Sequence, residues 1–92
     1  MSKIAFNAWS RERIQQGRKF CTSRHKKYLD DKRVHHISPQ MPWGIIRDYL
    51  YGLEGADSPE ELQQVIESIM HRHVPDDELF HVHFGDFREV TE

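Results

Sequence analysis

The chain has 92 residues, enough for one domain with a modest core and no room for a second. Hydrophobic residues make up 37% and charged residues 30% of the sequence, which indicates a folded, soluble protein. The single cysteine excludes an internal disulfide framework, and no apolar run approaches the length of a signal segment or a membrane span. We therefore expect a single domain over residues 1–92 that is cytoplasmic and does not enter a membrane.

The net charge is only −2, but the charges are unevenly distributed along the chain. Residues 1–47 hold eleven Lys and Arg against three Asp and Glu, whereas residues 48–92 hold two against twelve. This asymmetry has two interpretations. The basic half could form a face for phosphates, or the acidic half could fold back onto the basic half and neutralise it.

The N-terminal half alternates short strands with one helix. Its predicted strands are residues 3–6, 18–24 and 33–37. Asn7 or Ser10 offers an N-cap for a helix over about residues 8–16, and Gly17 can end that helix in the left-handed conformation. Residues 38–42 contain two prolines and are predicted to break regular structure.

The C-terminal half contains two predicted helices and a last strand. Apolar residues at helical spacing predict a short helix over residues 43–50. Residues 58–61, Ser-Pro-Glu-Glu, form a capping box that starts a helix over about residues 59–71. The apolar stripe of this helix is Leu62, Val65, Ile66, Ile69 and Met70, which we expect to face the core. Residues 80–84 alternate strictly, with Phe80, Val82 and Phe84 predicted to point inward. This order of elements predicts an α+β fold with a curled or closed sheet.

Residues 17–24 carry the most distinctive pattern. Gly17, Lys19, Thr22 and Arg24 match a G-x-K-x-x-T-x-R spacing, and the chain thereby resembles the ASCH domains, small relatives of the PUA fold. The other stretches that resemble this family, in the same order, are residues 4–7, 41–46, 50–62 and 82–84. The resemblance covers nearly the whole chain.

The resemblance implies a small PUA-like β-barrel with helices at its rim. This chain departs from the family pattern in its middle. Only sixteen residues lie between Arg24 and Met41, where relatives commonly fit two or more strands. We therefore expect a barrel with abbreviated middle strands.

The resemblance also implies an activity. Some small bacterial members of the family hydrolyse the amide of N4-acylated cytidines, such as N4-acetylcytidine, to cytidine and a carboxylic acid, using a lysine, a threonine and a glutamate. The matching positions in this sequence are Lys19, Thr22 and Glu54, with Asp57 as a nearby substitute for Glu54. The implied chemistry requires no cofactor and no metal.

Amide cleavage requires a nucleophile, a base that removes its proton and an acid that protonates the leaving nitrogen. Lys19 can act as a base only in its neutral form. Desolvation and the neighbouring Arg24 favour that form, whereas an ionised Glu54 opposes it, so Lys19 and Glu54 could share a proton. Either Thr22 is the nucleophile, or Thr22 positions the carbonyl while Lys19 activates water. In a regular strand Lys19 and Thr22 would face opposite sides, so their cooperation would require a bulge or a strong twist.

Several other residues have a functional and a structural interpretation. Arg24 could bind substrate or brace the site, and Tyr28 and Phe84, with Trp9 and Trp43 as further candidates, could stack on a pyrimidine or belong to the core. Cys21 could be a nucleophile or a buried apolar residue. The seven histidines could chelate zinc but lack companion ligands at suitable spacing, so we expect outward-facing histidines and no metal site.

The leading hypothesis is therefore an amidohydrolase that acts on a small modified pyrimidine nucleoside, as a monomer or weak homodimer. The first alternative is a non-catalytic RNA-binding module. The basic run that would contact RNA is Arg18, Arg24, Lys26, Lys27, Lys32 and Arg33. The second alternative is a ribonuclease built on the same pocket.

Overall fold

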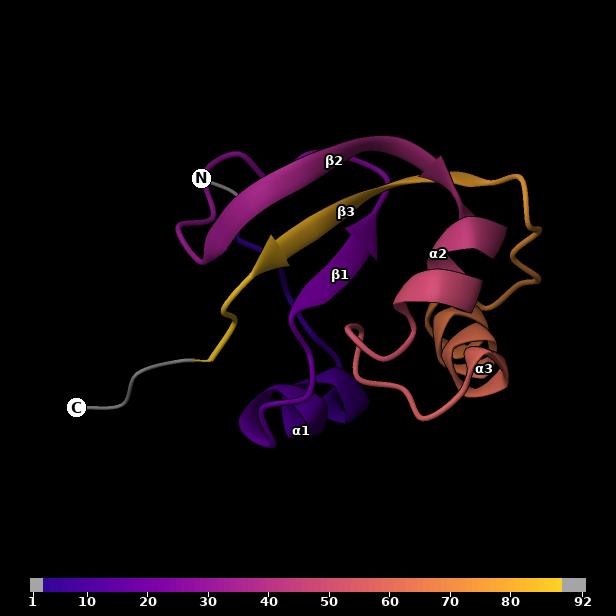
Figure 1. Cartoon of the computed structure of the whole chain (residues 1–92), viewed down its shortest axis with the longest axis horizontal. Coiled ribbons are helices and arrows are strands. Elements are labelled where there is room, and N and C mark those ends of the chain that lie inside the picture. Colours follow the sequence, from indigo (N-terminus) through magenta and orange to yellow (C-terminus); the bar gives the residue numbers. More distant parts are fainter. Residues whose placement is uncertain (1–2, 89–92) are drawn as a thin grey trace.

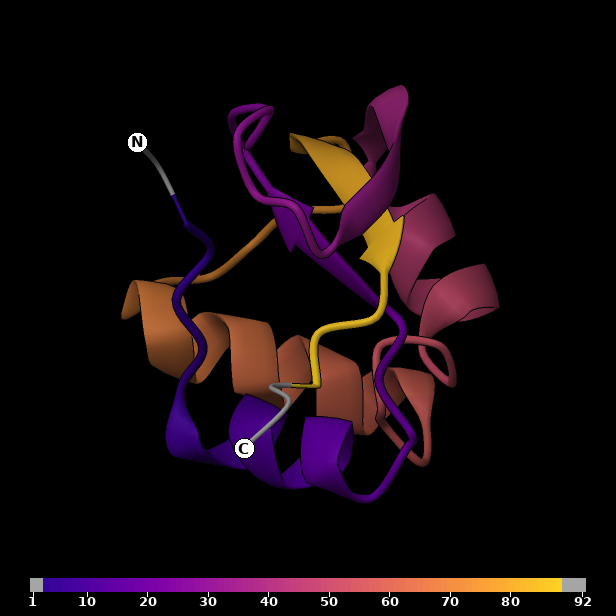
Figure 2. The same cartoon turned by 90° about the vertical axis from the view of Figure 1, so that its left-hand side faces the viewer.

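A three-stranded antiparallel sheet in the order β1-β3-β2 is the framework of residues 3–88, which are the residues that the computed structural model describes (Figure 1). The strands are β1 (Cys21–Arg24), β2 (Val34–Pro42) and β3 (Leu79–Gly85). The helices are α1 (Ala8–Gln15), α2 (Trp43–Leu50) and α3 (Pro59–Met70). Figures 1 and 2 show the sheet as one layer with α1 and α3 below it. The predicted α+β class is confirmed, but the sheet is open, so the described residues do not show a closed barrel.

Helix α1 begins and ends as its sequence predicts. The Asn7 side-chain oxygen accepts a hydrogen bond from the Ser10 N–H at 2.9 Å, which satisfies one of the free donors of the first turn. Ile14 is buried, and Gly17 follows the helix with φ of 72°, a backbone conformation that favours glycine.

The predicted strand over residues 3–6 is wrong, because this segment pairs with side chains and not with a neighbouring strand. The Ile4 N–H donates to Asp31 Oδ2 at 2.9 Å, and the Ile4 carbonyl accepts from Arg33 Nη2 at 2.8 Å. Asp31 and Arg33 also bind each other, with Nη2 and Oδ2 2.6 Å apart. The segment is therefore held by an ion pair in the turn between β1 and β2.

The predicted break at residues 38–42 is also wrong, because β2 continues through Pro42. Strand β2 is an edge of the sheet, where a proline without an N–H is tolerated. The pairing register shifts between Ile37 and Gln40, and within this irregularity the Ser38 hydroxyl accepts a hydrogen bond from the Val82 N–H at 2.9 Å. The serine side chain thus replaces a backbone hydrogen bond between β2 and β3 at this position.

The two predicted C-terminal helices are present. In α3 the Ser58 hydroxyl accepts from the Glu61 N–H at 3.1 Å, and Pro59 is the first helical residue. The Glu61 carboxylate reaches back to the N–H of Asp57 at 2.6 Å, one residue before the N-cap. The helix ends at Met70, just before the C-terminus predicted for it.

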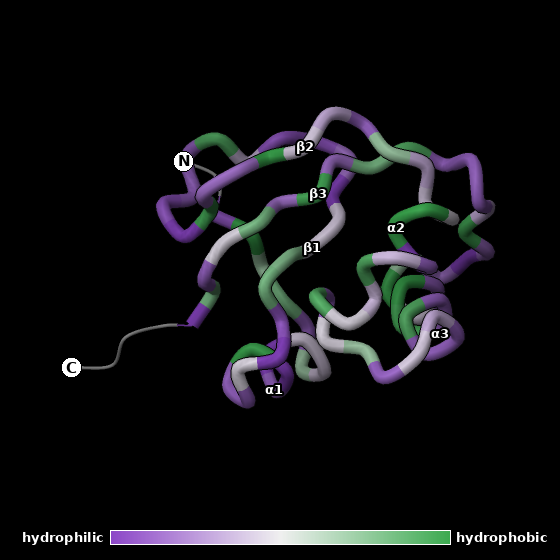
Figure 3. Tube along the Cα trace, viewed as in Figure 1, coloured by the Kyte–Doolittle hydropathy of each residue, from purple (hydrophilic) through white to green (hydrophobic). Residues whose placement is uncertain are grey.

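The main core lies between the sheet, α2 and the start of α3. Its buried residues are Cys21, Trp43, Ile46, Ala56, Leu62, Val74, Phe80 and Val82. Figure 3 shows apolar residues concentrated on α2 and α3.

Phe80 and Val82 point inward as predicted, but His83 is also fully buried because the central strand β3 is covered on both faces. Its Nε2 accepts from the Tyr28 N–H at 3.1 Å, and burial lowers the pKa of His83, which favours the neutral ring.

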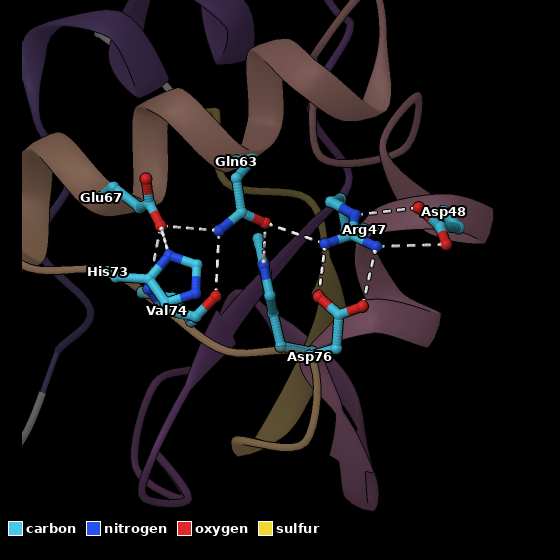
Figure 4. Close-up of polar contacts among 8 residues, drawn as sticks. Arg47, Asp48, Gln63, Glu67, His73, Val74 and Asp76 are labelled. Atoms are coloured by element: carbon cyan, nitrogen blue, oxygen red, sulfur yellow. Dashed lines mark hydrogen bonds and ion pairs between the residues drawn. The ribbon is translucent and has the colours of Figure 1, made fainter.

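A polar network ties the loop after α3 to both C-terminal helices (Figure 4). Gln63 is at its centre. Gln63 Oε1 accepts from Trp43 Nε1 at 2.7 Å and from Arg47 Nη1 at 3.1 Å. Gln63 Nε2 donates to Glu67 Oε2 at 2.8 Å and to the Val74 carbonyl at 2.9 Å. Every hydrogen-bonding position of the amide is therefore occupied.

The two oppositely charged halves of the sequence are in contact with each other. Among the described residues, the ion pairs that join them include Arg13–Glu61, Arg18–Asp57, Lys19–Glu54, His25–Glu78 and Arg47–Asp76. The acidic half thus folds back onto the basic half, the second of the two interpretations of the charge asymmetry. In the part of the chain that the structure describes, no helix is long and apolar enough to cross a membrane.

Candidate active site

Lys19 lies just before β1, in a segment anchored to the turn after α2. The N–H groups of Phe20 and Cys21 both donate to the Leu53 carbonyl, at 2.7 and 3.2 Å. Regular strand geometry begins only at Cys21, so the predicted strand over residues 18–24 is shorter at its start. Lys19 therefore lies outside the regular strand, and within the strand Ser23 contacts the Glu54 carboxylate that Lys19 contacts, whereas Thr22 contacts Arg24.

Glu54 is positioned by the tight turn that follows α2. Its N–H donates to the Leu50 carbonyl at 3.0 Å, and Gly55 beside it has φ of 96°. Lys19 Nζ lies 3.2 Å from Glu54 Oε1 and 3.0 Å from the Glu54 carbonyl oxygen. Lys19 and Glu54 are only 5% and 4% exposed, so this is a buried ion pair. Burial makes such a pair strongly interacting and sensitive to the loss of either partner.

Ser23 completes the environment of the Glu54 carboxylate, and the sequence patterns did not indicate it. The Ser23 hydroxyl donates to Glu54 Oε2 at 2.6 Å, while Lys19 contacts Oε1. Both carboxylate oxygens therefore have a donor, and the plane of the carboxylate is fixed. The sequence feature that could have indicated Ser23 is its position in the predicted strand, where a small hydroxyl side chain lies between the polar residues Thr22 and Arg24.

Thr22 and Arg24 form the other side of the polar cluster. Arg24 Nε donates to Thr22 Oγ1 at 3.3 Å, and Arg24 Nη2 donates to the Ala5 carbonyl at 3.0 Å. The guanidinium carbon lies 5.4 Å from the centre of the Phe6 ring. Burial lowers the pKa of Arg24, although a guanidinium keeps its charge in proteins. Arg24 therefore braces Thr22 and the N-terminal segment.

A cavity of about 270 Å³ brings these groups together. Its polar lining residues include Lys19, Thr22, Ser23, Arg24 and Glu54, and its other wall is formed largely by α3. The three residues predicted to act together thus share one sheltered cavity. The buried Lys19 and the half-buried Arg24 outnumber the single carboxylate Glu54, an arrangement that suits a carbonyl oxygen on which negative charge develops.

The predicted aromatic contacts are divided between this cavity and the core. Tyr28 and Trp9 line the cavity. Trp43 is fully buried in the core. Phe84 does not line the cavity, which corrects the predicted contact with substrate, because its ring packs 5.9 Å from His36 on β2.

The remaining candidates lie outside the polar cluster. Asp57 is exposed and pairs with Arg18, so it does not substitute for Glu54. Cys21 is fully buried in the core, and burial raises the pKa of its thiol, so that a nucleophilic thiolate is disfavoured. His25 and His73 each contact a glutamate at 2.7 Å, and residues 3–88 contain no group of three or more potential metal ligands.

Three members of the predicted basic run are engaged within the chain itself. Arg18 pairs with Asp57, Arg24 points into the cavity, and Arg33 pairs with Asp31. The ammonium of Lys26 lies 4.8 Å from the centre of the Tyr28 ring.

Comparisons of the chain with protein-family models, with curated proteins and with solved structures found no significant match. The roles of the site residues are therefore inferred from their geometry and from the residue patterns described above.

Proposed function

We propose that the protein is an amidohydrolase of the ASCH type, with an abbreviated PUA-like fold, that cleaves N4-acylated cytidine to cytidine and a carboxylic acid. One observation carries the proposal. Lys19, Thr22 and Glu54 line the same cavity, none is more than 5% exposed, and the lysine and the glutamate are in direct contact at 3.2 Å. An ordinary solvated lysine would not be buried against a carboxylate in this way.

The Lys19–Glu54 pair supplies the proton transfers of the proposed reaction. Together the two groups accept the proton of the attacking hydroxyl and later deliver a proton to N4 as the C–N bond breaks. Over the whole reaction one water is consumed: its hydroxyl ends on the acyl carbon and its other proton on the leaving nitrogen. Lys19 and Arg24 stabilise the negative charge that develops on the carbonyl oxygen.

Thr22 has one of two roles in the proposed reaction. Its oxygen accepts a hydrogen bond from Arg24, which leaves the hydroxyl proton available for donation. If a base removes that proton, Thr22 is the nucleophile and an acyl-threonine intermediate forms before water releases the acid. If the hydroxyl instead donates to the substrate carbonyl, water activated by the Lys19–Glu54 pair attacks directly.

The test is hydrolysis of N4-acetylcytidine, followed by chromatographic detection of cytidine. We expect turnover by the protein as it exists and a decrease in kcat of about 100-fold or more in Lys19→Met, Thr22→Val and Glu54→Gln, because a positioned acid or base contributes about 10²- to 10⁴-fold. Asp57→Asn is the matched control, since Asp57 is exposed and outside the cluster. Absence of turnover, or unchanged turnover in all three variants, would reject the proposal.

A second candidate function is RNA binding, which a separate cavity favours. This cavity has a volume of about 650 Å³ and is lined by Lys3, Arg11, Arg33 and Arg88 together with Phe6 and Phe87. None of the described residues that line it is acidic. Cations beside aromatic rings are the usual means of binding a sugar-phosphate backbone and stacked bases.

The two functions make different predictions. RNA binding here should weaken as salt rises and should be reduced in the Arg11→Gln/Arg88→Gln double variant, with Lys19→Met unaffected. Intact RNA after incubation would separate binding from the ribonuclease alternative.

A further inference from the structure

The apolar stripe of α3 faces the core in part, as its sequence predicts. Leu62 is buried in the main core, and Ile66 and Met70 pack against that core. Val65, Ile66 and Met70 are partly exposed, and Ile69 is 45% exposed. All five line the 270 Å³ cavity. The stripe thus also lines a cavity, and part of its apolar surface remains accessible there.

The polar cluster and this apolar wall belong to the same cavity. Lys19, Thr22 and Glu54 form its polar end, while α3, with Phe80 from β3, supplies the apolar lining. The N-cap Ser58 of α3 closely follows Glu54 in the chain, so the wall begins near the carboxylate. A ligand that matches both parts has a polar, hydrolysable group joined directly to an apolar chain.

We propose that the α3 wall, formed by Leu62, Val65, Ile66, Ile69 and Met70, is a binding site for the acyl chain, and that the preferred substrate carries an aliphatic acyl group of about six carbons in place of acetyl. The proposal rests on the amidohydrolase function above. An acetyl group would leave most of this wall in contact with water. The cavity is at the lower limit of ligand pockets, which span roughly 300–1,000 Å³, so the acyl chain and the pyrimidine fill it and the ribose lies at its mouth.

The first experiment measures kcat/KM for a series of N4-acetyl-, N4-butanoyl- and N4-hexanoylcytidine. Burial of each methylene group is expected to raise kcat/KM by about fourfold at most, so hexanoyl should exceed acetyl by tenfold or more. If hexanoylcytidine is hydrolysed no faster than acetylcytidine, the acyl site is rejected while the amidohydrolase function stands.

The second experiment locates the site on α3. Ile69→Thr and Ile66→Thr keep a branched side chain but introduce a hydroxyl, and each should lower kcat/KM for hexanoylcytidine by about fivefold or more with little effect on acetylcytidine. Gln64→Thr is the matched control, because Gln64 is exposed on the same helix and does not line the cavity. An equal loss with both substrates would overturn this location. If Ile66→Thr does not fold, Ile69→Thr, at a more exposed residue, still tests whether the acyl chain binds to α3.

A third measurement does not depend on turnover. Hexanoate, the product acid, should shift the methyl resonances of Ile66 and Ile69 at concentrations at which acetate does not. If hexanoate binds but no acylcytidine is hydrolysed, the proposed reaction is rejected and the acyl site is retained. If hexanoate does not bind and no substrate is turned over, both proposals are rejected.

Discussion

At the scale of single residues, the Glu54 carboxylate is held at both of its oxygens. Lys19 contacts one of its oxygens and Ser23 the other, and all three residues are nearly inaccessible to water. A carboxylate held at both oxygens cannot rotate to follow a substrate. The site is therefore organised before a ligand arrives, which reduces the cost of orienting groups during a reaction.

Ser23→Ala tests this organisation. The substitution leaves Glu54 Oε2 without its serine donor, and hydrogen bonds to charged groups contribute about 1.5–3 kcal/mol. We expect the free energy of unfolding, measured with urea, to fall by about 2 kcal/mol, and kcat to fall because the carboxylate is no longer fixed. Ser68→Ala is the control, since that hydroxyl is exposed and bonds within its own helix. Equal effects of the two substitutions would contradict this role for Ser23.

The sequence predicted part of the site and missed part of it for identifiable reasons. The meeting of Lys19, Thr22 and Glu54 was predicted from a motif, and the three residues share a cavity. Ser23 was missed because its role depends on where the turn after α2 places Glu54, about thirty residues later in the chain. Phe84 was misplaced because strand alternation specifies a face of the sheet but not which aromatic side chain on that face borders the cavity.

At the scale of elements, the turn between α2 and α3 requires a glycine at residue 55. Gly55 has φ of 96°, and a Cβ atom there would lie 2.8 Å from Arg13 Cβ and 3.3 Å from Lys19 Cβ. The Arg13 Nε also donates to the Gly55 carbonyl at 3.0 Å. A side chain at residue 55 would therefore disturb α1, the turn and Lys19 together.

We expect Gly55→Ala to lower the free energy of unfolding by at least about 2 kcal/mol, because the left-handed conformation alone costs a residue with a Cβ about 1–2 kcal/mol. Activity should fall as well, since Glu54 is adjacent. Gly52→Ala in the same turn is the matched control: no atom lies within 4 Å of its Cβ position. Chemical denaturation of the two variants measures the difference, and similar stabilities would contradict the expectation.

The elements that the sequence predicted best are those whose signals are local. Helix α3 followed from its capping box and helix α1 from Asn7 and Gly17, because caps and stops act within a few residues. The strands were predicted less well because they depend on distant partners. Residues 3–6 look like a strand but bind the side chains of Asp31 and Arg33, and β2 passes through its prolines because it is an edge strand.

At the scale of the whole molecule, cations bound to carboxylates make stability dependent on the ionised form of those carboxylates. The Glu78 carboxylate lies 2.6 Å from Nη2 of Arg72, in its own acidic half, and 2.7 Å from Nε2 of His25, in the basic half. The hydrogen bond from Arg72, followed by that from His25, lowers the pKa of Glu78 from 4.5 to about 2. The ionised form is therefore bound more strongly in the folded state than in the unfolded chain.

A depressed pKa stabilises the fold above the unfolded value and loses this contribution as pH falls towards the folded value. For Glu78 that window is pH 4.5 to about 2. In urea titrations across this window, we expect the free energy of unfolding to fall less steeply with decreasing pH in Glu78→Gln than in the unaltered protein. Asp77→Asn, at an exposed neighbouring residue, should retain the original slope. Identical slopes in Glu78→Gln and the unaltered protein would contradict the assignment.

The complete burial of Cys21 has a practical consequence for the study of this fold. The chain's single sulfhydryl is buried within the main core, on the strand β1, which pairs with β3. A thiol-modifying reagent can react with it only after that part of the core has opened to solvent. The rate of alkylation of Cys21 therefore reports how often the core opens, and this measurement requires no engineered label.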